Sequence, residues 1–356
     1  MSTVQHIGLS LGRIQHWHDG LGEFSRQLVR ELAAQAPRLR EQFGWELHLH
    51  LPRRWHGEFG DDVRYLDTHT AQRWLHLRNI KFSLWHTLHQ HNRLKAPLGT
   101  LRRIETVHDL NYLHLKQGAK VERYRQRQRR RLARYDTIVA ITQFVAADLA
   151  RELNPLPTPL QVIYNGATDL TCAPQTVVAG LGASPFLLHI SRMAPSKNIV
   201  ALLDLAASWP EQQIVLAGAS SAYSTAVKHM VAQRALTNVT VKLDLSEAHK
   251  AWLFANCLGF LFPSIAEGFG LPPIEAMHFG KPVFLSKLTS LPEIGGTAAY
   301  YFENFGGSEM RMIIEAALAT AATPERREKI AEHARRFSWQ RCAQAYIALY
   351  KNLLGS

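Results

Sequence analysis

The chain has 356 residues, which is more than one ordinary hydrophobic core holds and therefore predicts two domains. Its hydrophobic content of 46% is typical of a globular protein, and no apolar run of about 18 residues could form a transmembrane helix. Three widely spaced cysteines disfavour a disulfide framework and a structural zinc site. The net charge of +12 favours an anionic partner, namely nucleic acid, a phosphorylated small molecule or an acidic membrane face.

The first half of the chain alternates short apolar runs with amphipathic segments. After the strand predicted at 4–11, helical spacing runs through 22–35. Four further strands are predicted before the middle of the chain, at 45–51, 103–110, 135–142 and 160–166. The N-terminal segment lacks the basic and apolar regions of a secretory signal, so we expect a cytoplasmic protein.

The pattern starts again in the second half. Strands are predicted at 185–191, 212–218, 238–245, 258–264 and 281–287. Helices are predicted between them at 198–208, 224–236, 246–257 and 272–279. This alternation predicts parallel sheets with helices on both faces, and two such units predict two Rossmann-like domains that face each other across a ligand-binding cleft.

The expected domain boundaries follow from the two patterns. Residues 1–166 form the first domain, 167–184 a linker and 185–339 the second domain. The segment 340–356 has helical periodicity with no strand after it, which is consistent with a helix that packs back on the first domain.

The stretch "EGFGLPPIEAM" places two acids around a glycine turn, at Glu267 and Glu275. Gly268 and Gly270 let the backbone approach a ligand, and the two prolines that follow suit the first turn of a helix. The start of that helix favours phosphate or sugar oxygens. Carboxylates bind hydroxyl groups well, so a sugar or ribose is the expected ligand. A solvated Glu267 and a helix-capping Glu275 form the structural alternative.

Three other stretches fall where strands are predicted to end. Arg192 and Lys197 lie in the loop after 185–191, where two cations can grip a diphosphate. Gly20 and Gly22 open a helix in "HDGLGEF" and offer amides to an anion, although the full dinucleotide fingerprint is absent. His108, in "ETVHDLNY", could bind a substrate, although an isolated His-Asp pair is more often structural.

Seven arginines fall within the twelve positions from Arg123 to Arg134. A solvated helix face and a docking surface for anionic lipid or a phosphorylated acceptor both fit this pattern. No zinc-finger spacing or aromatic RNA-binding motif accompanies the charge, so a nucleic-acid partner is not expected. The arginines expected at an anionic acceptor or membrane are Arg127, Arg129, Arg130 and Arg131.

Taken together, these stretches resemble the family 4 retaining glycosyltransferases, also called group 1, which have the GT-B fold. The resemblance covers nearly the whole chain and is carried by "GLGEFSRQLVREL", "TVHDL", "DTIVAITQFVAADL", "VIYNG", "SRMAPSKN", "IVLAG", "FPSIAEGFGLPPIEAMHFGKPV", "LPEIGG" and "FSW". Its most specific part is the E-x7-E element, in which Glu267 and Glu275 enclose seven residues.

The resemblance implies specific catalytic roles. The expected catalytic residues are His108, Arg192, Lys197 and Glu267. Arg192 and Lys197 would bind the donor diphosphate and stabilise the departing nucleotide, while Glu267 and His108 would lie near the donor sugar. No Asp-x-Asp pair for a divalent metal is found, so no metal or other cofactor is expected and the two cations would supply the positive charge.

The resemblance also implies a donor-binding set. Glu275 would hold the ribose, and Leu243 would lie near the nucleotide base. The backbone around the donor is expected from Gly268, Phe269, Gly270 and Leu271. Gly20 and Gly22 match the loop that closes over phosphate and acceptor, but Asp19 replaces the first glycine of the commoner double-glycine form.

The resemblance predicts a retaining, metal-independent glycosyltransferase that uses a nucleotide-diphosphate sugar. The expected acceptor is a glycan or glycolipid of bacterial surface polysaccharide or lipopolysaccharide synthesis, and the enzyme would be cytoplasmic or peripheral on the inner membrane. Two alternatives stay open: a non-catalytic nucleotide- or glycan-binding protein on the same fold, and a sugar-nucleotide epimerase. The donor base and sugar are left undetermined.

Overall fold

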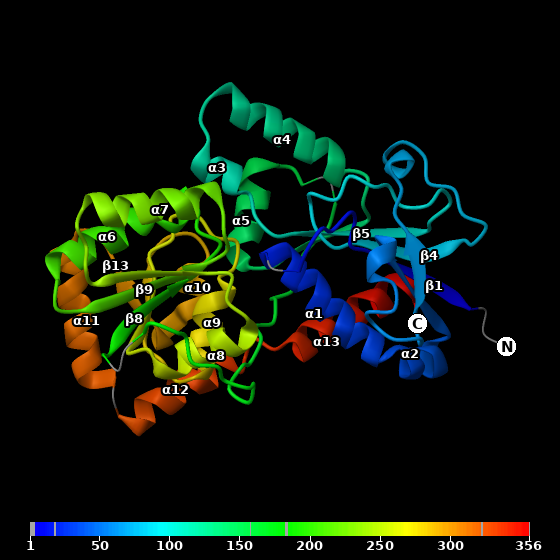
Figure 1. Cartoon of the computed structure of the whole chain (residues 1–356). Coiled ribbons are helices and arrows are strands. Elements are labelled where there is room, and N and C mark those ends of the chain that lie inside the picture. The colour runs from blue at the N-terminus through cyan, green and yellow to red at the C-terminus, as the bar shows by residue number, and fades with distance from the viewer. Residues whose placement is uncertain (1–3, 18, 157, 182–183, 322, 356) are drawn as a thin grey trace. The chain divides into compact units, whose positions relative to one another are not determined.

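The computed structural model divides into two α/β domains (Figure 1), and it describes residues 4–17, 19–156, 158–181, 184–321 and 323–355. The first domain comprises residues 1–166 and 338–356, and the second comprises residues 167–337. Each domain contains one sheet in which all paired strands are parallel, which confirms the predicted fold class. The segment 167–184, expected as a linker, falls within the second domain, except that residues 182–183 lie outside the described residues.

The sheet of the first domain has the order β3-β2-β1-β4-β5-β6-β7. Its strands are β1 (Gln5–Ser10), β2 (Trp45–Leu51), β3 (Arg64–Asp67), β4 (Phe82–Thr87), β5 (Arg102–Val107), β6 (Thr137–Ala140) and β7 (Leu160–Val162). The strand order reverses between β1 and β4. In open parallel sheets, ligands bind at such a switch point, outside the carboxyl ends of the strands.

The helices of this domain are α1 (Gly20–Ala34), α2 (Ala36–Phe43), α3 (Asn111–Leu115), α4 (Ala119–Leu132), α5 (Gln143–Glu152) and α13 (Trp339–Leu354), with 3-10 turns η1 (Arg53–Trp55) and η2 (Thr70–Arg73). In α1 the residues at helical spacing, Phe24, Leu28 and Leu32, are fully buried. That buried face explains why this segment forms a stable helix.

The C-terminal helix α13 packs against α1 and against the sheet of the first domain. Its Tyr346 and Tyr350 hydroxyls lie 2.7 Å from Thr106 Oγ1 and His86 Nδ1, respectively. His86 Nε2 lies 2.8 Å from Thr106 Oγ1, which closes a buried polar network. Burial lowers the pKa of His86 to about 3, so its ring is neutral. These bonds fix the helix on β4 and β5.

The second domain repeats this topology with the strand order β10-β9-β8-β11-β12-β13. Its strands are β8 (Phe186–Ile190), β9 (Gln213–Gly218), β10 (Val239–Leu243), β11 (Gly259–Phe262), β12 (Val283–Ser286) and β13 (Tyr300–Phe302). Its helices are α6 (Ile199–Ser208), α7 (Ala222–Gln233), α8 (Glu247–Asn256), α9 (Leu271–His278), α10 (Leu291–Gly295), α11 (Gly307–Ala321) and α12 (Pro324–Ala334), with 3-10 turns η3 (Pro195–Lys197) and η4 (Gly296–Ala298). Here the order reverses between β8 and β11.

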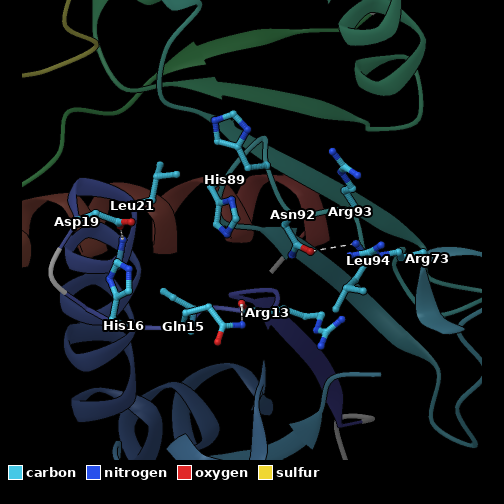
Figure 2. Close-up of a pocket in the computed structure, with 13 residues that line it drawn as sticks. Arg13, Gln15, His16, Asp19, Leu21, Arg73, His89, Asn92, Arg93 and Leu94 are labelled. Atoms are coloured by element: carbon cyan, nitrogen blue, oxygen red, sulfur yellow. Dashed lines mark hydrogen bonds between the residues drawn. The ribbon is translucent and has the colours of Figure 1, made fainter. Parts of the chain in front are cut away.

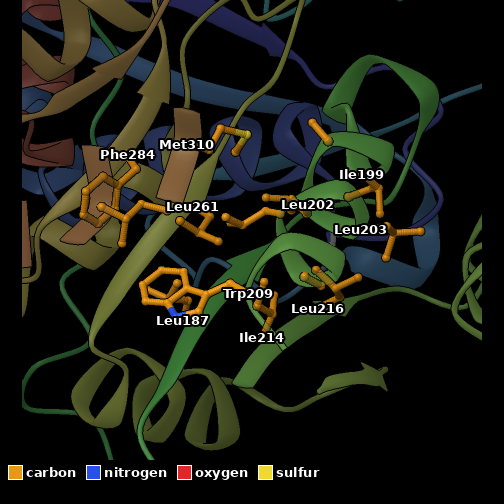
Figure 3. Close-up of a cluster of buried hydrophobic side chains, with 14 of the residues drawn as sticks. Leu187, Ile199, Leu202, Leu203, Trp209, Ile214, Leu216, Leu261, Phe284 and Met310 are labelled. Atoms are coloured by element: carbon orange, nitrogen blue, oxygen red, sulfur yellow. The ribbon is translucent and has the colours of Figure 1, made fainter. Parts of the chain in front are cut away.

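A large apolar cluster joins this sheet to its helices (Figure 3). Leu202 and Leu203 of α6, Trp209, Ile214 of β9 and Leu261 of β11 are among its buried members. Apolar burial of this kind is the main force that fixes α6 and the central strands, and with them the loops at the strand ends. Among the described residues, no helix combines the length and the apolar character needed to cross a bilayer.

Candidate active site

The loop after β8 presents both predicted cations at the switch point of the second domain. Arg192 is exposed directly beyond the strand, and Lys197 ends the short turn η3 before α6 begins. The guanidinium of Arg192 makes no hydrogen bond or ion pair to any other residue that the structure describes, and is therefore available to an anion. Beneath the loop, the buried His189 bonds the Leu261 carbonyl through Nδ1 at 2.8 Å and Ser191 Oγ through Nε2 at 2.8 Å.

The loop after β11 faces the same edge of the sheet, because β8 and β11 are parallel neighbours. The Glu267 carboxylate forms a short ion pair with Lys197 Nζ, and both side chains are more than four-fifths buried. The same ammonium lies 5.2 Å from the centroid of the Phe262 ring. The pair thus joins the two loops across the switch point and holds Lys197 in place.

The backbone conformation of the glycine turn is fixed by Gly270 and by hydrogen bonds from Ser290. Gly270 has a φ of 119°, which favours glycine, and a Cβ there would lie 2.9 Å from Leu291 Cδ2. The Ser290 hydroxyl donates to the carbonyls of Glu267 and Phe269, at 3.1 and 3.0 Å. The Phe269 ring is buried, so the backbone of this residue is the part that a ligand could contact.

The helix that follows, α9, begins one residue before its predicted start at residue 272. Pro272 and Pro273 lie in its first turn, as predicted, and Glu275 is its fifth residue, beyond that turn. Since the prolines lack N–H groups, the amides at the start of α9 that could bind an anion belong to Gly270 and Leu271. Glu275 is half-buried, one turn along the helix from the glycine loop.

The end of β10 contributes a tight turn to this edge. Leu243 is the last residue of the strand, and Asp244 has a φ of 56°. The Asp244 carboxylate accepts from the backbone N–H of Ser220 at 2.9 Å and from its hydroxyl, and these hydrogen bonds lower its pKa. The predicted base-binding position, Leu243, therefore lies next to a turn that is held in place by hydrogen bonds to Ser220, just after β9.

In the first domain, the predicted glycine loop opens α1, but one of its amides is already bonded. Asp19 is the N-cap, and its carboxylate accepts from the Gly22 amide at 2.7 Å. A Cβ at Gly22 would lie 2.8 Å from the His16 carbonyl, whereas Gly20 has open space around it. Asp19 thus replaces the glycine of the commoner motif with a helix cap, and Gly22 is required for close packing.

A pocket of about 300 Å³ lies at the switch point of the first domain (Figure 2). Its walls come from the loops after β1 and β4 and from η2. The described residues that line it include the cations Arg13, Arg73 and Arg93, the histidines His16, His89 and His91, and one acid, Asp19. Such a lining favours an anionic or hydroxyl-rich ligand.

Two atoms in this pocket are buried without a hydrogen-bond partner among the described residues, Arg73 Nε and His89 Nδ1. His89 Nε2 donates to the Leu11 carbonyl at 3.1 Å, which leaves Nδ1 as an acceptor. Burial lowers the pKa of His89 to about 4, so the ring is neutral near pH 7. The pocket therefore has one hydrogen-bond donor and one hydrogen-bond acceptor without a partner among the described residues.

His108 follows β5 and is almost fully buried. Its Nε2 donates to the Leu88 carbonyl at 2.9 Å, and its ring meets Phe24 edge-on at 4.5 Å. Burial lowers its pKa to about 3. The imidazole is thus a neutral, oriented group that can accept a hydrogen bond through Nδ1 and cannot act as a cation.

The structure separates the arginines of α4 into two groups. Arg127, Arg129 and Arg130 are exposed. Arg131 instead turns inward, where its Nε and Nη2 lie 2.5 Å from Oε1 of the fully buried Glu105. It therefore holds the fold together and does not belong to the expected docking surface.

Sequence reasoning missed several site residues. Ser290, which fixes the glycine turn, and the pocket residues His89, Arg73 and Arg93 were not among the predicted residues. The position of His89 and Arg93 just after an apolar strand was an available signal, but that strand, β4, was not predicted. The described residues bring Arg192, Lys197 and Glu267 together at one edge of the second domain.

Comparisons with known proteins match both halves of the chain. The family model "Glycosyltransferase Family 4" matches residues 19–169, and "Glycosyl transferases group 1" matches residues 180–337. O-antigen chain mannosyltransferase B of Escherichia coli is 28% identical over 201 residues, covering 53% of this chain and 52% of that protein. The serotype-specific mannosyltransferase WbdA of Escherichia coli is 37% identical over 105 residues, 29% of this chain and 13% of its own length. The chain thus spans about half or less of these relatives.

Solved structures share the fold at low sequence identity. Sucrose-phosphate synthase from Thermosynechococcus elongatus superposes with a TM-score of 0.75 at 19% identity, covering 99% of both chains. Anabaena HepE in complex with UDP and glucose gives a TM-score of 0.68 at 16% identity, covering 98% of this chain and 100% of that one. With the two family models, which together span both domains, these matches show that the chain belongs to the family 4, group 1 glycosyltransferases, which have the GT-B fold.

Proposed function

We propose that the protein transfers a sugar from a nucleotide-diphosphate sugar to a glycan or lipid-linked acceptor in the synthesis of a bacterial surface polysaccharide such as lipopolysaccharide. The reaction proceeds with retention at the anomeric carbon and without a metal. The O-antigen mannosyltransferase relatives support polysaccharide synthesis, and HepE supports a nucleotide-sugar donor because it is solved with UDP and glucose.

One observation carries this proposal: Arg192 and Lys197 lie on one loop at the switch point, and Glu267 from the neighbouring loop pairs with Lys197. Because that pair is electrically neutral, Arg192 supplies the uncompensated positive charge of this loop. Lys197 has three N–H donors, so it can keep Glu267 and still bind a phosphate oxygen. Glu275, on α9, is assigned to the ribose hydroxyls.

In the proposed step, the bond between the anomeric carbon and the phosphate oxygen breaks, and its electron pair leaves with the nucleoside diphosphate. Arg192 and Lys197 stabilise this developing negative charge. The acceptor hydroxyl attacks from the face that the diphosphate leaves, and its proton passes to the departing phosphate oxygen. Glu267 would orient the donor sugar, with the neutral His108 as a hydrogen-bond acceptor.

The pocket of the first domain is assigned to the acceptor. Its three arginines can bind a phosphate or carboxylate group, and the free Nδ1 of His89 can accept from a sugar hydroxyl. The exposed Arg127, Arg129 and Arg130 of α4 would extend this positively charged surface toward the acceptor or an acidic membrane face.

The test is thermal unfolding against a panel of nucleotide sugars, followed by transfer assays with the donor that binds. A specific donor should raise the melting temperature, since ligands that bind only the folded state stabilise it. Arg192→Gln and Lys197→Gln should each lower kcat about 10²–10³-fold, the usual effect of losing one transition-state charge contact. Lys329→Gln, an exposed cation of the same domain, is the matched control.

The outcomes separate the alternatives. A binding protein would show the thermal shift without turnover, and an epimerase would convert the nucleotide sugar into an isomer without any acceptor. If no nucleotide sugar shifts the unfolding of the protein, the proposed donor site is wrong.

A further inference from the structure

The first domain exposes a group of large apolar side chains on two neighbouring loops. Trp74 is 69% exposed and Leu98 is 68% exposed. Leu75, Leu77 and Leu101 are each more than half exposed as well. Single exposed apolar residues are common, but five on adjoining loops form a patch that indicates an interaction surface.

Backbone hydrogen bonds hold the two loops together. The Leu98 amide donates to the His76 carbonyl at 2.8 Å, and the Lys95 amide donates to the Gln72 carbonyl at 2.9 Å. The Lys95 ammonium also donates to the Trp74 carbonyl at 2.8 Å. The apolar side chains are therefore presented on an ordered platform, which we name the apolar platform (residues 74–77 and 98–101).

The charge around the apolar platform is mainly positive, although Asp136 pairs with Arg102, next to Leu101, at 3.4 Å. Between Asp67 and Glu105 the sequence contains no aspartate or glutamate. The same interval contains seven lysines and arginines: Arg73, Arg78, Lys81, Arg93, Lys95, Arg102 and Arg103. An apolar surface framed mainly by cations matches an anionic lipid bilayer, in which Trp lies at the head groups and Leu enters the acyl boundary.

We propose that the apolar platform docks the protein on an anionic lipid membrane, with Trp74, Leu77 and Leu98 inserted at the interface. A second copy of the chain fits less well, because two such surfaces would bring like charges together. The location supports a lipid partner too. Arg73, which lines the acceptor pocket, directly precedes Trp74, so the platform adjoins a wall of that pocket.

The location also connects the apolar platform to α4. Arg131, in the last turn of that helix, donates to the Asn92 carbonyl at 2.6 Å, next to the pocket residue Arg93. A lipid-linked acceptor could then keep its lipid in the bilayer while its polar head enters the pocket. This last link rests on the proposed function, whereas membrane binding itself does not.

The experiment is vesicle sedimentation with the full chain, with neither donor nor acceptor present. The vesicles contain phosphatidylcholine alone or with about one-third phosphatidylglycerol. The test variant is Trp74→Gln/Leu77→Gln/Leu98→Gln, whose sites are all exposed enough to tolerate a polar side chain. The matched control is Val177→Gln/Met312→Gln, because those residues are 64% and 62% exposed in the second domain.

We expect the wild type and the control to bind the anionic vesicles equally well. The partition coefficient of the test variant on the same vesicles should be at least 10-fold lower. Wild-type binding should weaken with salt, because part of it is electrostatic. Equal binding by the test variant and the wild type would overturn the proposal. The proposal would also be overturned if the protein were a dimer without lipid and the test variant were a monomer. That result would mean that a second copy of the chain covers the platform.

A second, independent observation concerns three ligand-type side chains within the first four residues of β1 and β2. His6 pairs with Glu46 across the two strands, and His48 follows two residues later on the same face. His6 Nδ1 lies 3.0 Å from His48 Nε2 and 3.1 Å from Glu46 Oε2. The distance between Glu46 Oε2 and His48 Nε2 is 3.5 Å.

The geometry points to a tetrahedral divalent metal site, most simply for zinc. With Zn–N and Zn–O bonds of about 2.0–2.1 Å, tetrahedral ligands lie about 3.3 Å apart, and the three separations bracket this value. Arg64 Nε donates to Glu46 Oε1 at 2.9 Å, which orients the other carboxylate oxygen toward the histidines. The site lies at the edge of the sheet opposite the pocket, so its role is structural and separate from the proposed reaction.

Equilibrium dialysis against zinc, with metal analysis, tests this site. We expect one zinc ion per chain in the wild type, at least a 10-fold weaker affinity in His6→Asn, and a tetrahedral absorption spectrum when cobalt is substituted. His229→Asn, at an exposed histidine of the second domain, is the control. Zinc binding that is equal in the His6 variant and the wild type, or absent from both, would overturn the inference.

Discussion

Replacing Arg131 with glutamine tests whether this arginine belongs to the interior or to a surface. Glu105 on β5 is fully buried, and one of its oxygens, Oε2, has no hydrogen-bond partner among the described residues. Arg131 supplies the charge partner for the other oxygen. Even with this guanidinium beside it, burial raises the pKa of Glu105 from 4.5 to about 7.

Removing one partner of a buried ion pair costs about 3–5 kcal/mol, because the other charge is left uncompensated. In a domain of this size, each kcal/mol lowers the melting temperature by about 2–4 °C. Arg131→Gln should therefore unfold about 6–20 °C below the wild type at pH 8. Arg127→Gln, from the exposed side of the same helix, should change the free energy of unfolding by less than about 0.5 kcal/mol.

The pH dependence supplies a second readout. Because the folded pKa of Glu105 is raised, its contribution to stability is full below pH 4.5 and is lost as the pH rises through 7. At pH 5 the Glu105 carboxyl is protonated in the folded state of both proteins. The melting temperatures of the variant and the wild type should therefore lie closer together at pH 5 than at pH 8. Thermal and urea unfolding at the two pH values measure this difference.

The double variant Glu105→Gln/Arg131→Gln removes both charges and should recover part of the lost stability. The reasoning is refuted if Arg131→Gln and Arg127→Gln unfold alike at both pH values. The result also affects the membrane assays: a variant that includes Arg131 would lose vesicle binding through unfolding, so only Arg127, Arg129 and Arg130 are suitable for testing α4.

Three further predictions concern single positions. Gly270→Ala should destabilise the second domain by about 1–3 kcal/mol in urea unfolding, because its φ of 119° is strained for alanine and Leu291 occupies the space of a Cβ; an unchanged midpoint would contradict this. Asp19→Asn should keep the cap on Gly22 and the melting temperature. It should bind inorganic phosphate more tightly in titration calorimetry, because Asp19 is the one carboxylate among the described residues that line the pocket; weaker binding would count against an anion site. Tyr346→Phe should cost about 1–2 kcal/mol of unfolding free energy, since it breaks a buried hydrogen-bond network; a loss below 0.5 kcal/mol would mean that the network rearranges.

Much of the fold could be predicted from the sequence because its central strands are short, apolar and bounded by turn residues. The strands expected at 4–11, 45–51, 103–110, 135–142 and 160–166 correspond to β1, β2, β5, β6 and β7. The strands β3 and β4 of the first domain were missed, as was β13 of the second. β3 is a four-residue strand at the edge of the sheet with no fully buried residue, and β4 contains Trp85 and His86, which obscure an aliphatic pattern.

The sequence does not predict which side chains of distant loops contact each other. The cations Arg192 and Lys197 were recognised by their loop, but nothing in the local pattern shows that Lys197 pairs with Glu267, 70 residues away. In the same way, the spacing of the α4 arginines does not show which one turns toward a buried acid. Such contacts depend on strand order and on the rotation of each helix about its axis.

Strand order also explains where the polar residues gather. In the second domain the reversal lies between β8 and β11, and the loops after these two strands carry Lys197 and Glu267. In the first domain it lies between β1 and β4, and the loops after those strands line the arginine-rich pocket. At a reversal, the connections leave toward opposite faces of the sheet, so the strand ends remain open to a ligand. The missed strand β4 therefore has a functional consequence: without it the reversal in the first domain cannot be located, and the pocket residues His89 and Arg93 read as ordinary loop residues.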